Sequence, residues 1–170
     1  MLRVKKISAV LAATLLAAVA LAPGATAVTT LTTAQKAQLK YLAEEEKLAR
    51  DVYAYLAKNV TTQKFSNISR SEQTHMNYMA TLLTKYKVTN PTKGKAAGVF
   101  VNKDIQGLYN ALTKEGKVGV LAAYGVGVKV ENVDIGSLKE ILAKPLPVDV
   151  KAALDLMIAA SYNHLEAFSM

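Results

Sequence analysis

The feature that most constrains this fold is a helical spacing of apolar residues that carries charged groups on its inner side. In four long segments, apolar side chains recur every three or four residues, which is typical of helices packed around a shared core. No segment shows the sustained alternation of a strand. The sequence therefore predicts an all-α protein whose long helices form a four-helix bundle.

Cap and turn residues set the limits of the predicted helices. A hydroxyl of Thr32 or Thr33 can accept the free N–H groups at the start of the first helix, and Asn67 or Ser69 can do so for the second. A short helix after a Lys-, Gly- and Pro-rich loop is interpreted as an extra crossover helix. The predicted helices span residues 33–59, 69–87, 103–115, 118–143 and 148–168.

Each of the four apolar stripes carries an ionisable side chain where a core residue is expected. These residues are Glu46 in the first long helix, Glu72 and His75 in the second, Glu131 and Asp134 in the third, and His164 in the fourth. Burying an ionised carboxylate costs several kcal/mol unless it is paired or binds a metal. Carboxylates and neutral imidazoles suit iron, manganese and zinc. The combination predicts a site for two metal ions inside the bundle.

Other interpretations of single residues stay open. Glu45 also has apolar neighbours one turn away, so spacing alone does not choose between Glu45 and Glu46. Three glutamates early in a helix are also typical of a solvated acidic patch near the positive end of the helix dipole. Tyr53 lies two turns after Glu46 on the same face, where its hydroxyl could hold a ligand carboxylate by a hydrogen bond.

The N-terminus has the layout of a secretory signal peptide. A basic start is followed by an apolar run of about 15 residues and by the small triplet that ends at Ala27. We expect cleavage after Ala27, which leaves residues 28–170 as one secreted or periplasmic, cell-envelope domain without a stable membrane anchor. An uncleaved anchor is the alternative, but the run is shorter than the roughly 20 residues that span a bilayer.

The composition excludes several classes of site. The chain has no cysteine, which excludes disulfides, thiolate zinc sites and iron–sulfur clusters. Loss of the signal peptide with its three basic residues would lower the formal charge from +8 to +5. The remaining lysines are scattered along the chain. Since nucleic-acid binding needs a concentrated basic face, we expect no nucleic-acid partner.

Two segments resemble proteins with di-iron carboxylate centres. Residues 46–53 resemble the first-helix motif of rubrerythrins, in which Ala-Arg and then Tyr follow a ligand glutamate, and this favours Glu46 over Glu45. Residues 72–75 match the Glu-x-x-His of the second helix in ferritin-like proteins. The chain as a whole resembles an uncharacterised ferritin-like family of bacteria and archaea, the domain of unknown function 2202. Its landmarks are residues 44–53, 71–76, 98–100, 131–135 and 163–165.

The resemblance implies a ferritin-like bundle related to rubrerythrin and bacterioferritin-type proteins, with two bound metal ions. Iron is the first expectation, with manganese or zinc as alternatives. The implied ligands are Glu46, Glu72, His75, Glu131 and His164, and the implied activity is oxidation of ferrous iron or reduction of peroxide. Dioxygen or peroxide would then be a partner, and the absence of cysteine places electron transfer on a separate protein.

One position departs from the family pattern. The di-iron pattern has a second Glu-x-x-His on the last helix, but Ser161 lies three residues before His164. We hypothesise that Asp134 supplies the missing carboxylate, with an asymmetric or one-metal site as the alternative. A non-catalytic metal-binding bundle and a structural or interaction bundle are the rival functions. Assembly into a homo-oligomer is compatible with all of them.

Overall fold

The computed structural model describes residues 29–170, in which all regular structure is helical. The five helices are α1 (Thr33–Asn59), α2 (Lys64–Lys85), α3 (Lys103–Gly116), α4 (Val120–Leu142) and α5 (Val148–Ser169). The prediction of an all-α chain with four long helices and one short helix is confirmed for these residues. The signal peptide predicted for residues 1–27 lies outside the described residues.

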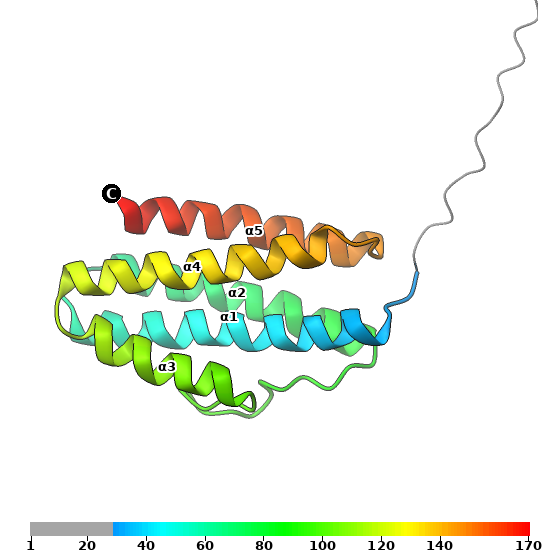
Figure 1. Cartoon of the computed structure of the whole chain (residues 1–170), viewed down its shortest axis with the longest axis horizontal. Helices are drawn as coiled ribbons and strands as arrows, with labels where there is room; N and C mark the ends of the chain where they lie inside the picture. The colour runs from blue at the N-terminus through cyan, green and yellow to red at the C-terminus, as the bar shows by residue number, and fades with distance from the viewer. Residues whose placement is uncertain (1–28) are drawn as a thin grey trace, which may run out of the picture.

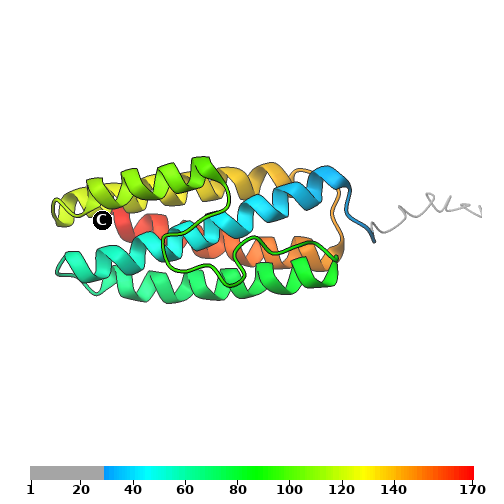
Figure 2. The same ribbon diagram turned by 90° about the horizontal axis from the view of Figure 1, so that it is seen from below.

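The four long helices lie side by side in two antiparallel pairs (Figures 1 and 2). The most extensive packing is between α1 and α2 and between α4 and α5, and the pairs meet where α1 contacts α4 and α2 contacts α5. The short helix α3 packs on the outside against α1 and α4. Every long helix therefore presents one face to a common interior.

The first helix begins as the sequence predicts. The Thr32 hydroxyl accepts a hydrogen bond from the backbone N–H of Gln35 at 3.2 Å, and the Gln35 side chain accepts the Thr32 N–H at 2.9 Å. This reciprocal pair is a capping box, which satisfies two N–H groups that the first turn would otherwise leave free. The predicted cap at Thr32 is therefore confirmed.

The second helix begins earlier than predicted. It starts at Lys64, so the predicted cap residues Asn67 and Ser69 lie within its first two turns. The Ser69 hydroxyl donates to the Arg50 carbonyl oxygen of α1 at 3.0 Å instead of capping α2. Phe65 is fully buried in the core, and burial of this ring stabilises a turn for which the sequence has no side-chain cap.

The apolar core is divided into two clusters. One surrounds Tyr53 and Phe65, and the other surrounds Leu39 and Leu83. On α1, Glu46 lies between the residues of the first cluster and those of the second. The buried polar residues of α2, α4 and α5 lie at the same height along the long axis of the molecule. A layer of buried polar groups therefore crosses the middle of the molecule.

On α4, the apolar spacing predicts a buried stripe of Tyr124, Val128, Glu131 and Ile135, but the observed buried face differs from it near the start of the helix. Tyr124 and Val128 are only half-buried, whereas Val126 and Val130 are buried. The difference arises because α3 packs against this part of α4, so that Val126 and Val130 join a cluster with residues of α3. Farther along α4, Glu131 and Ile135 are buried as predicted.

A buried ion pair on α1 holds the segment before α3. The Lys47 ammonium, 1% exposed, donates to the Asp51 carboxylate and to the Ala96 carbonyl oxygen at 2.8 Å. Asp51 also accepts the backbone N–H of Gly98 at 2.8 Å and a bond from the Arg50 guanidinium. These contacts fasten residues 96–98 across the outer side of α1, where Figure 2 shows the segment crossing this helix.

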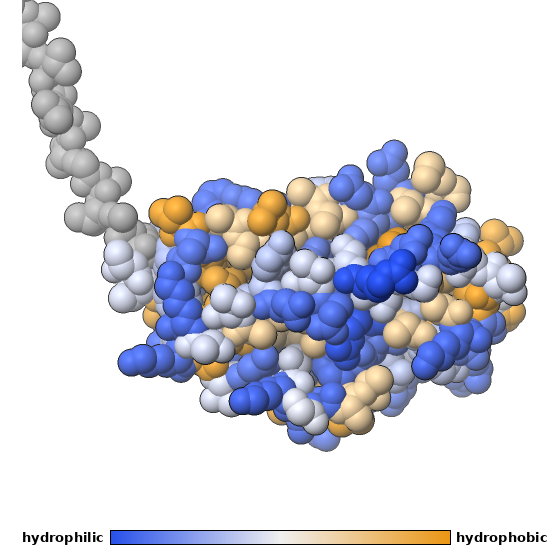
Figure 3. All heavy atoms as spheres, turned by 180° about the vertical axis from the view of Figure 1, so that it is seen from behind, coloured by the Kyte–Doolittle hydropathy of each residue, from blue (hydrophilic) through white to orange (hydrophobic). Residues whose placement is uncertain are grey.

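The surface mixes polar and apolar residues. Figure 3 shows hydrophilic and hydrophobic side chains interspersed over one face of the molecule. Among the described helices, none combines the length and the hydropathy that a membrane span requires.

Candidate metal centre

Five of the predicted ligands meet in the polar layer of the core. All five are buried, and His164 is the most exposed of them at 8%. Their donor atoms form two overlapping groups, and within each group one donor atom per residue lies within 4.8 Å of the others. The first group is Glu46, Glu72 and His75, and the second is Glu72, Glu131 and His164. Glu72 belongs to both groups.

The two oxygens of Glu72 face different histidines. Its Oε2 lies 2.8 Å from His75 Nδ1, and its Oε1 lies 2.8 Å from His164 Nδ1. His75 Nδ1 is also 3.1 Å from Glu46 Oε2, and His164 Nδ1 is 3.6 Å from Glu131 Oε1. The two imidazole rings stack with centroids 5.8 Å apart. Glu72 therefore contacts both histidines and links the two groups of donor atoms.

Without a cation, the charges of this cluster are balanced by protons. Burial raises the pKa of Glu46 to about 7. Burial also favours the neutral form of Glu72, but contacts with His164 and His75 outweigh this effect and lower its pKa to about 2. Burial lowers the pKa of His75, yet contacts with Glu46 and Glu72 raise it to about 11. The carboxylates therefore attract positive charge, which protonated imidazoles supply in the absence of metal.

Three donor atoms of the cluster have no hydrogen-bond partner among the described residues. They are Glu46 Oε1, Glu72 Oε1 and His164 Nδ1. The last two, although 2.8 Å apart, are not aligned as a hydrogen bond. Buried polar atoms are nearly always satisfied, so a cluster of unsatisfied N and O atoms fits a cation. Three carboxylates and two imidazoles make a donor set that suits iron, manganese or zinc.

Tyr53 holds one carboxylate of the cluster. Its hydroxyl donates to Glu131 Oε1 at 2.6 Å, and its ring packs against Phe65 and Phe168. The sequence placed Tyr53 on the Glu46 face of α1, but the hydrogen bond reaches across to α4. Tyr53 therefore orients Glu131, and its predicted role of holding a metal ligand stays a prediction.

Asp134 lies beside the cluster but in neither ligand group. Its Oδ2 accepts a hydrogen bond from the Ser161 hydroxyl at 2.7 Å. Burial raises the pKa of Asp134 well above its usual range, with the Glu46 carboxylate as the next cause. The structure thus brings Asp134 and Ser161 together at the level of the centre. Whether Asp134 binds metal in place of a carboxylate at position 161 stays a hypothesis.

All three glutamates of the run Glu44-Glu45-Glu46 are buried, so the solvated acidic patch is not what forms here. Glu44 accepts the backbone N–H groups of Val101 and Asn102, just before α3. Glu45 accepts the Ser137 hydroxyl of α4 at 3.1 Å. Sequence reasoning missed both roles, because the partners lie more than 50 residues away and no local spacing indicates them.

The fold and the cluster define a class: an all-helical protein with a carboxylate–histidine cluster in its core. The chain belongs to the family of the uncharacterized protein domain DUF2202, whose sequence model matches residues 35–170. The predicted membership is confirmed, and the relation to rubrerythrins stays a prediction.

One relative and one solved structure support this assignment. The chain is 39% identical over 134 residues to the uncharacterized protein MJ0754 of Methanocaldococcus jannaschii, covering 79% of this chain and 72% of that protein. It is also similar to the crystal structure of hypothetical protein MJ0754 from Methanococcus jannaschii, with a TM-score of 0.80 at 36% identity. That match covers 85% of this chain and 83% of the other.

Proposed function

We propose that this protein is an exported, ferritin-like four-helix-bundle protein that binds two metal ions in its core. The observation that carries the proposal is the position of Glu72 between two groups of donor atoms that share it. Glu46 and His75 would hold one ion, Glu131 and His164 the other, and Glu72 would contact both. The antiparallel pairing of the long helices is consistent with a ferritin-like arrangement.

We infer that iron is the preferred metal, because carboxylate and imidazole donors suit it and residues 46–53 and 72–75 resemble motifs of di-iron carboxylate proteins. Iron at this centre would supply redox chemistry, in which ferrous iron is oxidised while dioxygen or peroxide is reduced. The residues of the chain would bind the ions and orient the ligands. Tyr53 would hold Glu131 in place by its hydrogen bond, and the Glu72 carboxylate would contact both ions. Repeated turnover with peroxide would need electrons from a separate partner protein.

The second candidate is metal binding without turnover. It is favoured by Ser161, which occupies the position where a second Glu-x-x-His motif would have its glutamate. The Ser161 hydroxyl donates a hydrogen bond to Asp134 instead. Without a carboxylate at position 161, Glu72 is the one residue that the two donor groups of the described chain share. A centre with fewer shared carboxylates would favour a protein that retains or sequesters metal over one that turns over.

Metal content and ferrous iron oxidation test these candidates together. The purified protein is analysed for bound elements, then depleted with a chelator and titrated with ferrous iron under nitrogen. Air or peroxide is admitted, and the ferric absorption and the consumption of oxidant are followed. The control is a His75→Gln, His164→Gln double variant, which retains the volume of both side chains but lacks both imidazoles.

We expect about two ions per chain in the wild type, ferric absorption after air, and loss of both in the double variant. Two bound ions without oxidation would support the binding protein and exclude the oxidase or peroxidase. A wild-type chain that binds no iron, manganese or zinc would overturn the proposal and leave a structural or interaction bundle.

A further inference from the structure

Buried atoms without a hydrogen-bond partner mark two places in the described part of the chain. Six such side-chain atoms occur, and three of them belong to the candidate metal centre. The other three are Gln38 Oε1, Glu45 Oε2 and Asp134 Oδ1. Gln38 and Glu45 belong to α1, and Asp134 belongs to α4. All three line the seam where α1 and α4 meet.

A groove lined by polar and apolar residues lies along this seam. It has a volume of about 300 Å³ and is lined by Ala37, Gln38, Tyr41, Leu42, Ser137 and Glu140. Glu140 lies at its mouth, where it accepts hydrogen bonds from Gln38 Nε2 at 2.9 Å and from Lys144 at 3.2 Å. Ser137 lines the groove and donates to Glu45 Oε1, so its hydroxyl connects the groove to the buried Glu45 carboxylate.

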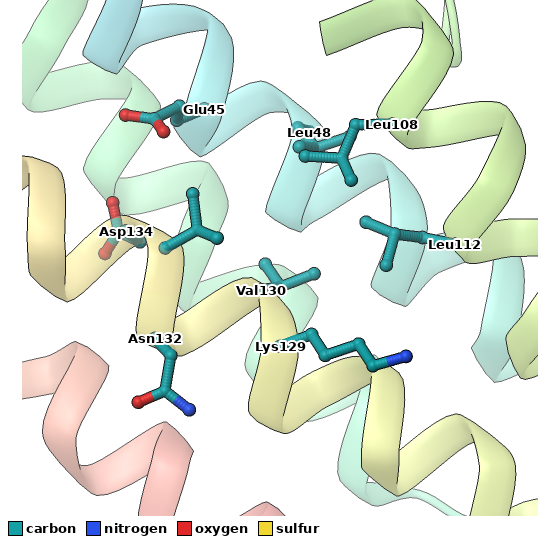
Figure 4. A pocket seen from close by; sticks show the side chains of 9 residues that line it. Glu45, Leu48, Leu108, Leu112, Lys129, Val130, Asn132 and Asp134 are labelled. Carbon is teal, nitrogen blue, oxygen red and sulfur yellow. The ribbon is translucent and has the colours of Figure 1, made fainter.

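A second groove, of about 420 Å³, adjoins the same carboxylates from the side of α3. Figure 4 shows Glu45 and Asp134 together at one end of it, away from Leu108 and Leu112. The wall beside these two leucines is apolar. A hydrated cation would therefore be favoured at the carboxylate end and beside Ser137 and Glu140 of the first groove, not along the leucines.

Glu45 lacks the compensation that its neighbours on α1 have. Glu44 is bonded to backbone N–H groups, and Asp51 is paired with Lys47 and Arg50. Glu45 has the Ser137 hydroxyl but no ion pair among residues 29–170, and its exposed fraction is 4%. Glu45 is thus a buried acid next to the centre whose Oε2 has no hydrogen-bond partner among the described residues.

We propose that the α1–α4 seam is the entry route for the divalent cations, and that Glu45 and Asp134 form a transient third cation site on this route. The inference rests on the proposed metal function. Oxygen donors of decreasing exposure occur along the seam: Glu140 and Ser137 line the groove, and Glu45, Asp134 and Glu46 are buried behind it. Carboxylate, hydroxyl and amide oxygens replace the water ligands of a hard divalent cation. A cation passing Glu45 and Asp134 would supply the positive partner that both carboxylates lack among the described residues.

The test measures how fast a cation enters, apart from any turnover. Metal-free protein is mixed with Co²⁺ in a stopped-flow instrument, and the visible absorption of the bound ion gives the loading rate. The ions bound at equilibrium are then counted by elemental analysis. The variant is Glu45→Gln, which retains the shape and removes the charge. The matched control is Glu166→Gln, a neutralised exposed glutamate on α5.

We expect Glu45→Gln to load at least about tenfold more slowly than the wild type, with the same number of ions bound at equilibrium. Glu166→Gln should load at the wild-type rate. Equal rates for Glu45→Gln and the wild type would overturn the proposal, as would equal slowing in both variants. Fewer ions in Glu45→Gln at equilibrium would make Glu45 a ligand of the centre and exclude a transient site. A wild type that binds no Co²⁺ at any concentration would instead refute the metal function itself.

Discussion

At the scale of single residues, the polar layer depends on short contacts between side chains from different helices. The 2.6 Å bond from Tyr53 to Glu131 joins α1 to α4, and the contacts of Glu72 join α2 to α5. Such contacts fix carboxylates that would otherwise rotate away from one another.

Replacing Tyr53 with Phe tests this orienting role. Tyr53→Phe keeps the ring between Phe65 and Phe168 and removes one hydrogen bond, so it should cost about 1 kcal/mol in the free energy of unfolding. Metal affinity should fall about 10–100-fold because Glu131 is released. Competition against a chromogenic chelator measures the affinity. Tyr78→Phe, at an exposed tyrosine, is the control and should change neither value; unchanged affinity in Tyr53→Phe would remove the orienting role.

Glu45 gives the metal-free protein a distinctive pH dependence. Its pKa is raised by burial from 4.5 to about 8, so the folded chain holds this proton more tightly than the unfolded chain does. The contribution of Glu45 to stability is therefore greatest below pH 4.5 and is lost as the pH rises towards about 8, by at most about 1.4 kcal/mol per pH unit.

Urea unfolding of the metal-free protein at several pH values measures this effect. Because other carboxylates also titrate, the informative quantity is the difference between wild type and Glu45→Gln. This difference should shift in favour of the variant between pH 5 and pH 8. A difference that does not vary with pH would show that Glu45 ionises normally.

At the scale of helices, the packing depends on a close contact between α4 and α5 and on a buried ion pair that holds the segment before α3. A Cβ atom added at Gly127 of α4 would lie 2.5 Å from the ring of Phe168 on α5. The absence of a side chain there allows the two helices to come together beside the centre.

Two glycines of α4 make a matched pair for this packing. Gly127→Ala should destabilise the protein by about 1–3 kcal/mol, because the Phe168 ring must move. Gly125→Ala, where a Cβ meets nothing within 4 Å, should be neutral or stabilising by up to about 1 kcal/mol through helix propensity. Thermal unfolding measures both, and equal effects would show that α4 and α5 are not in close contact at Gly127.

The buried Lys47–Asp51 pair is a second test at this scale. Asp51→Ala leaves the Lys47 ammonium without its carboxylate and frees the Gly98 N–H, at a cost of about 3–5 kcal/mol. Cleavage by a protease should then begin in residues 88–102. Asp155→Ala, which breaks an exposed pair with Lys151, should cost less than about 1 kcal/mol. Equal costs for the two variants would mean that the clamp does not hold this segment.

At the scale of the whole molecule, the proposed metal centre between two apolar clusters would couple folding to the binding of the cations. A ligand that binds only the folded state raises the free energy of unfolding by about 2.7 kcal/mol when its free concentration is a hundred times the dissociation constant. We therefore expect ferrous or manganous ions to raise the melting temperature by about 10 °C and a chelator to reverse the rise. The His75→Gln, His164→Gln variant should show no rise; a rise of equal size would place the ion elsewhere.

Much of this organisation could be predicted from the sequence, because it is periodic. The spacing of apolar residues predicted which residues of α1 and α5 are buried, and it placed Glu46, Glu72, His75, Glu131 and His164 on inward faces. The start of α2 could not be predicted, since it is stabilised by burial of Phe65 and not by a cap. The seam could not be predicted either, because Glu45 meets Ser137 only after α1 and α4 have packed.

The run from Glu44 to Glu46 fixes the rotation of α1 about its own axis. One carboxylate faces the backbone before α3, the next faces α4, and the third faces the centre. Successive residues of a helix point about 100° apart, so inserting or deleting one residue between Leu42 and Glu44 would turn either the three acids or the buried Leu39 and Leu42 away from their partners. We expect the first helix to tolerate many substitutions on its outer side but no change of length between these leucines and its acids.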